Sequence, residues 1–326
     1  MKLQRLSTFS AFALLALACG TLHAEYPTKT VTIVVPFSAG SDADFSARNL
    51  AQHAEKYLAP HQIVVVNQPG ASGAIGTSAV RQAAPDGHTL LLARIASQVI
   101  LPATDQKIPY QWSDFTYLSM LEMNPYVCAV RRESRYRTMQ NLIDDVKKRP
   151  GKLNYATVGP GTLQNFGPQY LFAILELPKT AAMAIPYKGS GDLTTALLGG
   201  QVDFACSNLG ALLPHFRSGT LRALMTTTAQ PLKDLPQVPT VRALGLPAME
   251  NFAAWSALAG PAGLPAEVTG RWSEVLAKLA RDPDWLGGID KLGAIPAIQS
   301  AAATEKYVRD QFQIYQMLSL HLGIRE

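Results

Sequence analysis

The sequence predicts an α/β fold of two lobes, each with an open, mainly parallel sheet flanked by helices. The chain has 326 residues, which suffices for two domains of ordinary size. Strand-like and helix-like segments alternate along it, and the alternation starts again near Tyr126. The composition, with 48% hydrophobic and 16% charged residues, is that of a globular protein and not of a disordered one.

The first half of the pattern predicts one sheet with its helices. Three apolar, β-branched runs, at residues 31–35, 63–66 and 89–93, are typical of buried parallel strands. Between them, helical periodicity extends from Asp44 to Leu58. A glycine-rich turn at residues 70–76 leads into a further helix.

A second series of elements predicts the other sheet. Its strands are expected at residues 127–130, 153–158, 184–186 and 202–206, and its helices at 139–148, 164–175 and the segment ending at Leu198. The remaining tail holds one predicted strand and two helices, which is too little for a third domain. We therefore expect lobe 1 to comprise residues 25–125 with 253–326, and lobe 2 to comprise residues 126–252, with two chain crossings between them.

The first 24 residues have the pattern of a secretory signal peptide. Lys2 and Arg5 precede a short apolar run at residues 10–18. This run is too short to span a bilayer as a stable helix. Cleavage after Ala24 is favoured, because the ordered pattern begins two residues later. A competing site before Cys19 would give a lipoprotein. Either site predicts a periplasmic protein, which we expect to be a monomer.

The charge distribution argues against a nucleic-acid partner. Loss of the signal peptide lowers the net charge from +5 to +3, and the remaining charges are interspersed. The one basic cluster, Arg131, Arg132, Arg135 and Arg137, is best interpreted as a solvated loop.

Cys128 and Cys206 lie in apolar, strand-like runs, where two buried thiols or a disulfide are both compatible with the sequence.

The sequence lacks the motifs of the common enzyme classes. It has no P-loop, nucleophile elbow, H-E-x-x-H or C-x-x-C motif. Gly159-Pro160-Gly161 begins like a dinucleotide-binding loop, but Gln164 stands where the third glycine belongs. The histidines are scattered without metal-ligand spacing. We therefore expect no enzymatic activity, no cofactor and no metal.

Small-residue loops follow three of the predicted strands. They lie at residues 38–42, 159–162 and 188–191, and each leads into a helix. Ligands of open α/β sheets bind outside the carboxyl ends of the strands, where free N–H groups at a helix start attract anions. Two such loops on facing lobes could hold one anionic ligand, although ordinary strand-to-helix turns have the same composition.

Several blocks of the sequence resemble the extracytoplasmic receptors of tripartite tricarboxylate transporters, the Bug receptors. The blocks, in chain order, are YPTK (26–29) with VVPFSAG (34–40), VVNQPGASGAIG (65–76), AAPDGHTLL (83–91), PGKLNYA (150–156), PYKGS (186–190) with LGGQVD (198–203), and PQVPT (236–240) with GLP (245–247). Each block alone is weak, but together they follow one another in the family's order from residue 26 to residue 247.

The resemblance implies a periplasmic-binding-protein fold, type II-like, that closes around a small organic carboxylate. It also implies partners, namely the large and small membrane subunits of a secondary transporter. In this family the first strand-to-helix loop holds the proximal carboxylate, partly through ordered water. Carried onto this chain, that loop comprises Ser38, Ala39, Gly40 and Ser41, with Asp44 capping the following helix. The second lobe would contribute Gly161, Thr162, Ser190 and Asp203.

Departures from the family pattern suggest the class of ligand. Ser38 and Ser41 replace a usual proline and glycine, and Gln164-Asn165 replaces a usual Thr-His pair. Arg94 stands after the third strand, where small polar residues are usual. A guanidinium there could bind a second carboxylate in bidentate fashion, or it could instead point to solvent or bridge the lobes. The resulting hypothesis is a dicarboxylate, with aromatic dicarboxylates among the candidates.

Two other functions stay open at this point. A sensory receptor would bind its ligand identically but pass the closed state to a signalling protein. An enzyme on the same fold would need a converging set of reactive groups, for which the acid/base candidates are Asp42, Asp44 and Asp203.

Overall fold

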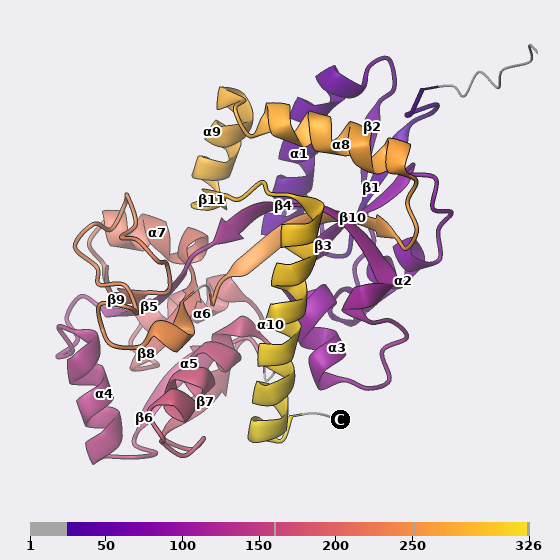
Figure 1. Cartoon of the computed structure of the whole chain (residues 1–326). Coiled ribbons are helices and arrows are strands. Elements are labelled where there is room, and N and C mark those ends of the chain that lie inside the picture. Colours follow the sequence, from indigo (N-terminus) through magenta and orange to yellow (C-terminus); the bar gives the residue numbers. More distant parts are fainter. Residues whose placement is uncertain (1–24, 160, 251, 325–326) are drawn as a thin grey trace, which may run out of the picture.

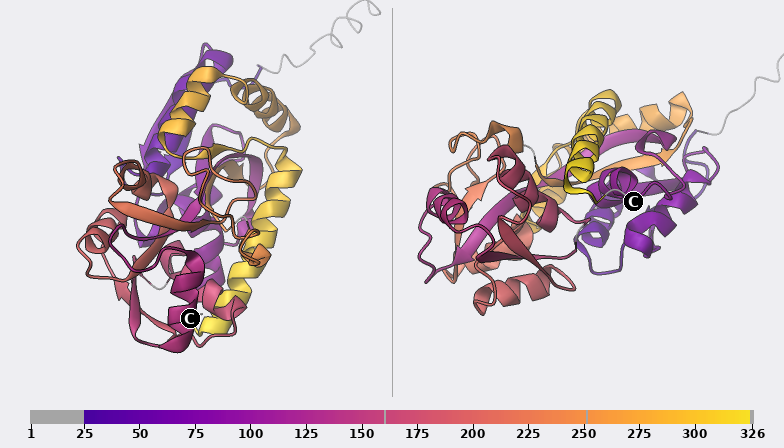
Figure 2. Two further views of the ribbon diagram at one scale, coloured as in Figure 1. Left: turned by 90° about the vertical axis from the view of Figure 1, so that its left-hand side faces the viewer. Right: turned by 90° about the horizontal axis from the view of Figure 1, so that it is seen from below.

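The computed structural model describes residues 25–159, 161–250 and 252–324, so the predicted signal peptide and Cys19 lie outside the described residues. Two sheets organise the described chain, and helices cover both of them (Figures 1 and 2). The chain passes between the sheets at Pro125 and again just before Ala254, and we call these two places the crossings.

The first sheet has six strands in the order β11-β4-β10-β3-β1-β2. Its strands are β1 (Val31–Val35), β2 (Ile63–Asn67), β3 (Thr89–Arg94), β4 (Phe115–Asn124), β10 (Ala254–Pro261) and β11 (Ile295–Pro296). The second sheet has five strands in the order β7-β6-β8-β5-β9. These strands are β5 (Tyr126–Arg131), β6 (Leu153–Thr157), β7 (Ala182–Pro186), β8 (Phe204–Asn208) and β9 (Leu221–Thr226).

Both sheets are mixed, which differs from the mainly parallel sheets that the sequence predicts. β1 pairs in parallel with β2 and β3, and β6 pairs in parallel with β7 and β8. β10 is antiparallel to β3 and β4, and β5 is antiparallel to β8 and β9. The reason is the connectivity, because β5 and β10 each begin at a crossing and run away from it. The parallel strands therefore point their carboxyl ends toward the crossings.

The helices connect these strands and cover both faces. The α-helices are α1 (Asp42–Leu58), α2 (Ala74–Arg81), α3 (Leu101–Thr104), α4 (Met139–Lys148), α5 (Leu163–Ile174), α6 (Ser190–Leu198), α7 (Leu209–Arg217), α8 (Ala266–Leu279), α9 (Pro283–Lys291) and α10 (Ala301–Leu322). Short 3-10 turns are η1 (Ala71–Gly73), η3 (Trp112–Asp114) and η4 (Pro247–Met249), and η2 (Ala96–Ile100) is a π-helical turn.

Alternation along the strands separates two apolar cores in lobe 1. On β3, Leu90 and Leu92 join a cluster with Trp272 of α8 and Trp285 of α9. Leu91 and Ala93 face the opposite side of the sheet and join a cluster that continues into lobe 2. Successive strand residues point to opposite faces, so helices pack against both sides of this sheet.

The last helix packs on both lobes. α10 belongs to the predicted lobe 1, and Figure 1 shows it running from the first sheet toward α5. Its buried Tyr315 packs edge-on against Phe166 of α5, with ring centroids 5.3 Å apart. Near its C-terminus, the Leu322 carbonyl accepts a hydrogen bond from Lys179 Nζ at 3.4 Å. α10 thus contributes to a continuous core across the two lobes.

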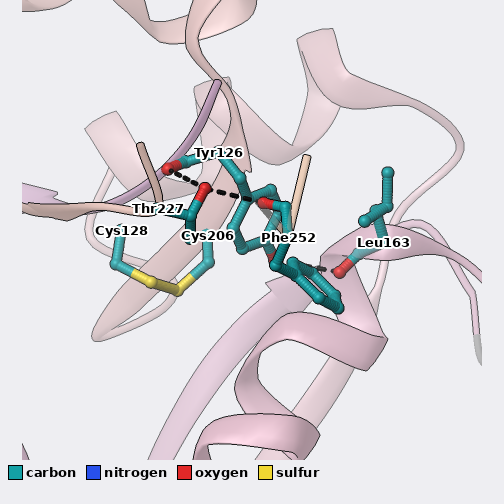
Figure 3. Close-up of a disulfide and its surroundings, with 6 residues drawn as sticks. All are labelled: Tyr126, Cys128, Leu163, Cys206, Thr227 and Phe252. Atoms are coloured by element: carbon teal, nitrogen blue, oxygen red, sulfur yellow. Dashed lines mark hydrogen bonds between the residues drawn. A yellow bond between two sulfur atoms is a disulfide. The ribbon is translucent and has the colours of Figure 1, made fainter. Parts of the chain in front are cut away.

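Lobe 2 contains a disulfide, one of the two alternatives that the sequence leaves open. Cys128 of β5 and Cys206 of β8 are directly opposite each other in the sheet, and their sulfurs are bonded (Figure 3). Beside it, Thr227 Oγ1 donates a hydrogen bond to the Phe252 carbonyl at 2.6 Å, and the Thr227 backbone N–H donates to the Tyr126 carbonyl at 3.0 Å. These bonds hold the two chain segments of the crossings next to each other.

Candidate functional site

A cavity of about 370 Å³ lies between the carboxyl ends of strands from both lobes. We call it the cleft cavity. Lobe 1 contributes the start of α1, the end of β3 and η2, and lobe 2 contributes the start of α5 and the end of β8. Its lining residues are Phe37, Ser41, Asp42, Ala43, Ser72, Arg94, Ile95, Ala96, Ile100, Leu101, Thr104, Gly161, Thr162, Leu163, Gln164, Asn208 and Ala254.

The predicted helix cap at the first loop is wrong, because Ser41 and not Asp44 is the N-cap of α1. Ser41 has an extended backbone, with φ −80° and ψ 163°, and its Oγ accepts the Asp44 N–H at 3.3 Å. A cap residue stands outside the helix in this conformation. Asp44 lies three residues further on, inside the first turn, and reaches back to the loop instead.

The carboxylate of Asp44, in the first turn of α1, holds the backbone of the first loop (residues 38–41) in place. The residue is 3% exposed, and its Oδ2 accepts the backbone N–H of Gly40 at 2.9 Å. Asn67 Nδ2 donates to Oδ1 at 2.9 Å, and Arg48 Nε donates to Oδ2 at 3.1 Å. Burial acts to raise the pKa of Asp44, but the hydrogen bonds from Arg48, Gly40 and Asn67 outweigh it and hold the pKa below its usual value.

The loop itself only partly borders the cleft cavity. Ser41 lines it, while Ser38, Ala39 and Gly40 are exposed and stand outside the lining. Gly40 has a φ of +77°, a conformation that glycine adopts without strain. The start of α1 therefore faces the cavity with a fixed backbone and a serine hydroxyl.

Arg94, the last residue of β3, lines the cavity from the sheet side. It is 9% exposed, and its Nη1 donates to Ser256 Oγ of β10 at 2.7 Å. The same nitrogen lies 3.8 Å from Glu122 Oε1 of β4. Both partners belong to the sheet of lobe 1, so Arg94 neither extends into solvent nor bridges the lobes.

The second lobe brings the start of α5 to the cavity. Thr162 stands at the N-cap position, but its Oγ1 donates to the Gly159 carbonyl at 2.7 Å and makes no capping bond. Gly161 and Gln164 also line the cavity. The Gln164 Nε2 group is 3.4 Å from Ser207 Oγ. Two helices, α1 and α5, thus begin at the same cavity from opposite lobes, where their positive ends favour an anion.

Two predicted lobe 2 residues are not brought to the cavity. Asp203 stands directly before β8, at the amino end of the strand, where it accepts the Asn154 N–H at 2.8 Å. Ligands of open α/β sheets bind at the carboxyl ends of the strands, so Asp203 is not part of the proposed site. Ser190 begins α6 after β7, on the correct side of the sheet but outside the lining.

The sequence interpretation missed Asn208. This residue ends β8 and lines the cleft cavity, and its Oδ1 is buried without a hydrogen-bond partner among the described residues. A polar residue at the carboxyl end of a predicted strand is the signal that could have identified it. Asp42, which ends the predicted loop 38–42 and is one of the acid/base candidates, also lines the cavity and adds a negative charge at its α1 side.

The lining combines polar groups from both lobes with apolar side chains. Among the described residues that line the cleft cavity there is no histidine, cysteine or lysine. Of the acid/base candidates only Asp42 lines the cavity, since Asp203 is remote and Asp44 is buried and hydrogen-bonded to the first loop. The cavity thus offers a guanidinium, the Asp42 carboxylate, two helix starts and neutral hydrogen-bonding side chains.

A larger cavity of about 470 Å³ lies beside the crossings. Met123 and Pro125 line it near the first crossing and Ala253 near the second, together with the segments 227–234 and 293–296. Lys233 is its basic side chain, and two aspartates accompany it. The ends of β4 and β9 and the start of α7 border this cavity as well, but no arginine stands among its described lining residues, so we take the smaller cavity as the candidate anion site.

One group of side chains has a geometry compatible with a metal. His53, Asp282 and Asp284 each offer a ligand atom within 4.8 Å of the others. However, Asp282 is the N-cap of α9 and forms an ion pair with Lys56. An ammonium group therefore already neutralises the buried carboxylate of this group.

Within the described part of the chain no helix combines the length and apolar character needed to cross a membrane.

Comparisons with known proteins agree with this architecture. Residues 46–323 match the family described as "Tripartite tricarboxylate transporter family receptor". Protein BugT of Bordetella pertussis is 31% identical over 293 residues, which cover 88% of this chain and 87% of BugT. The structure of the periplasmic binding protein BugD has a TM-score of 0.73 and 28% identity, covering 92% of this chain and 99% of BugD. This similarity confirms the predicted two-lobed fold.

Two further solved structures contain ligands. MatC from Rhodopseudomonas palustris, with bound malate, is 26% identical with a TM-score of 0.74, and covers 90% of this chain and 100% of that chain. R. palustris Rpa4515, with adipate, is 25% identical with a TM-score of 0.78, and covers 92% of this chain and 99% of that chain. On the family match, together with the fold and the cavity between its lobes, this chain belongs to the receptors of the tripartite tricarboxylate transporter family.

Proposed function

We propose that this protein is a periplasmic receptor that captures a small dicarboxylate in the cleft cavity and delivers it to a tripartite secondary transporter. Aromatic dicarboxylates are among the candidates, because Phe37 and several aliphatic side chains line the cavity. Export by the predicted signal peptide would place the protein in the periplasm. The partners would be the large and small membrane subunits that such a transporter requires.

The observation that carries the proposal is the position of Arg94 relative to the two helix starts. Arg94 lies on the sheet side of the cavity, while the first turns of α1 and α5 border it from the two lobes. One carboxylate can bind at the helix starts and the other at the guanidinium. The dicarboxylates malate and adipate in the related structures support the same ligand class.

A thermal-shift screen of the purified mature protein tests the ligand class. The panel would contain aliphatic and aromatic mono-, di- and tricarboxylates, with amino acids and nicotinate as controls. A ligand that binds only the folded state stabilises it by about 2.7 kcal/mol at a hundredfold excess over its Kd. We expect the largest shift from a dicarboxylate. A shift from amino acids alone would contradict the proposed class.

A separate experiment tests the membrane partner. The mature protein, immobilised and saturated with its ligand, would be incubated with detergent-solubilised membranes of its own host. Recovery of multi-spanning transporter subunits is expected from the proposal, whereas recovery of a signalling protein would support the sensory alternative.

A further inference from the structure

A row of three buried polar side chains crosses the sheet of lobe 1 behind the cleft cavity. Ser256 of β10 is the register partner of Arg94 on β3 and of Glu122 on β4. Directly opposed residues in neighbouring strands project to the same face. The three side chains therefore stand side by side, and their exposed fractions are 9% for Arg94, 0% for Ser256 and 1% for Glu122.

Arg94 stands between a buried carboxylate and the cavity. Its Nη1 donates to Ser256 Oγ at 2.7 Å and lies 3.8 Å from Glu122 Oε1. Among the described residues, this nitrogen is the part of the guanidinium that has a hydrogen-bond partner. The side chain also lines the cavity. The other N–H groups of Arg94 are thus available to a ligand, while Glu122 supplies its counter-charge.

Glu122 is an incompletely satisfied carboxylate. Neither of its oxygens has a hydrogen-bond partner of normal geometry among the described residues. Burial raises the pKa of Glu122, and the charge of Arg94 and the nearby hydroxyls of Ser256 and Ser46 oppose this effect only in part. An ionised Glu122 therefore depends on Arg94 for its stabilisation.

The charged groups around Glu122 come from two elements. Arg94 on β3 favours the ionised form, and Asp42 at the start of α1 disfavours it. Ser46 of α1 and Ser256 of β10 contribute uncharged hydroxyls, and Pro296 is the register partner on β11. Because Asp42 also lines the cavity, a ligand carboxylate at Arg94 would add a further negative charge to the same region.

We propose that Glu122 is the resident counter-ion of Arg94, and that it takes up a proton from solvent when a ligand carboxylate pairs with Arg94. The physical reason is that two carboxylates close to one guanidinium repel each other, so the buried one becomes neutral. This inference rests on the proposed function, since it requires a ligand with a carboxylate at Arg94. Glu122 is a positioning residue, because it acts on the ligand through Arg94.

Titration calorimetry in buffers of different ionisation enthalpy measures the proton uptake directly. The probes are malate, adipate and terephthalate, each paired with a monocarboxylate of similar size. For a dicarboxylate that binds, we expect uptake of up to about one proton, and an affinity that rises by at most about tenfold per unit of falling pH. These measurements use the wild-type protein, so they do not depend on how any variant folds.

A variant of Glu122 tests whether this residue is the group that takes up the proton. Glu122→Gln keeps the shape and removes the titration, so it should bind the dicarboxylate with no proton uptake and an affinity that is independent of pH. Glu274→Gln is the matched control, because Glu274 is exposed and pairs with Arg271 on α8. This control should leave the proton uptake unchanged.

The outcomes separate the two proposals. Dicarboxylate binding without proton uptake in the wild type overturns the role of Glu122 and leaves the proposed function standing. Uptake that persists in Glu122→Gln also overturns the assignment. If no dicarboxylate of the panel binds, the proposed function fails, and the inference fails with it.

Discussion

The carboxylate of Asp44 accepts the backbone N–H of Gly40 at 2.9 Å, so a buried side chain in the first turn of α1 holds the loop that precedes the helix. Asn67 at the end of β2 binds the same carboxylate and also donates to the Phe37 carbonyl at 3.1 Å. The loop is therefore tied to the strand beside it as well as to its own helix. This preorganisation keeps the start of α1 in place for a ligand.

Asp44 should make the free energy of unfolding depend on pH in the acidic range. The pKa of Asp44 is lowered in the folded protein, so its contribution is present above about pH 4 and is lost as the pH falls through the folded-state pKa. In urea denaturation at neutral pH, Asp44→Asn should lower the free energy of unfolding by about 1–3 kcal/mol. The difference between variant and wild type should shrink in acid. A difference that stays constant with pH would contradict the assigned ionisation.

Arg94 should distinguish dicarboxylates from monocarboxylates. The double variant Arg94→Gln with Glu122→Gln removes the guanidinium without leaving a buried unpaired carboxylate. Loss of a charge-assisted hydrogen bond should weaken dicarboxylate binding by about tenfold to a hundredfold, and should change monocarboxylate binding little. Calorimetric Kd values for a matched pair of ligands measure both effects. Equal losses for the two ligands would remove the role of Arg94 at the second carboxylate.

Gly167 should be required for the packing of α5 against the first crossing. A methyl group at this position would overlap the ring and hydroxyl of Tyr126, whose OH donates to the Leu163 carbonyl at 2.9 Å. Gly167→Ala should therefore lower the free energy of unfolding by about 1–3 kcal/mol. Gly191→Ala in α6 is the control, because a methyl there meets no atom within 4 Å and alanine favours helices. An unaffected stability of Gly167→Ala would show that Tyr126 can move aside without cost.

The disulfide should contribute to stability more than to ligand binding. It joins residues 78 positions apart, and the bridge lies in the sheet of lobe 2, outside the lining of the cleft cavity. Replacing both Cys128 and Cys206 by Ser should lower the free energy of unfolding by about 2–5 kcal/mol, and the Kd should change little. Thiol titration of the unfolded, unreduced protein gives a direct check, since free thiols would contradict the bridge.

Periodicity predicted the regular elements better than their directions. The buried strand Val31–Val35 and the helix after it were identifiable, because β-branched runs and helical spacing are local signals. The strand Phe115–Asn124 was not predicted, since its composition is mixed and its pairing with β10 is set by distant residues. The antiparallel direction of β5 and β10 follows from the crossings, which no local pattern encodes.

The same distinction holds for the candidate site: the sequence can indicate residues at strand ends but not relations between neighbouring strands. Five predicted residues stand at or after the carboxyl ends of strands, a position that the sequence can indicate. All of them line the cleft cavity: Ser41, Arg94, Gly161, Thr162 and Gln164. Asp203, which the family resemblance suggests as a ligand contact, lies directly before β8 at the amino end of the strand and outside the lining. Glu122 could not be found from sequence, because its relation to Arg94 arises only through Ser256 on the strand between them.

The most direct test is a crystal structure of the mature protein with the dicarboxylate that gives the largest thermal shift. The account predicts one carboxylate within hydrogen-bond distance of the backbone N–H groups at the start of α1 or α5. It predicts the second carboxylate on the guanidinium of Arg94, with both lobes in contact with the ligand. A ligand bound in the larger cavity beside the crossings, or bound in the cleft cavity without contact to Arg94, would contradict it.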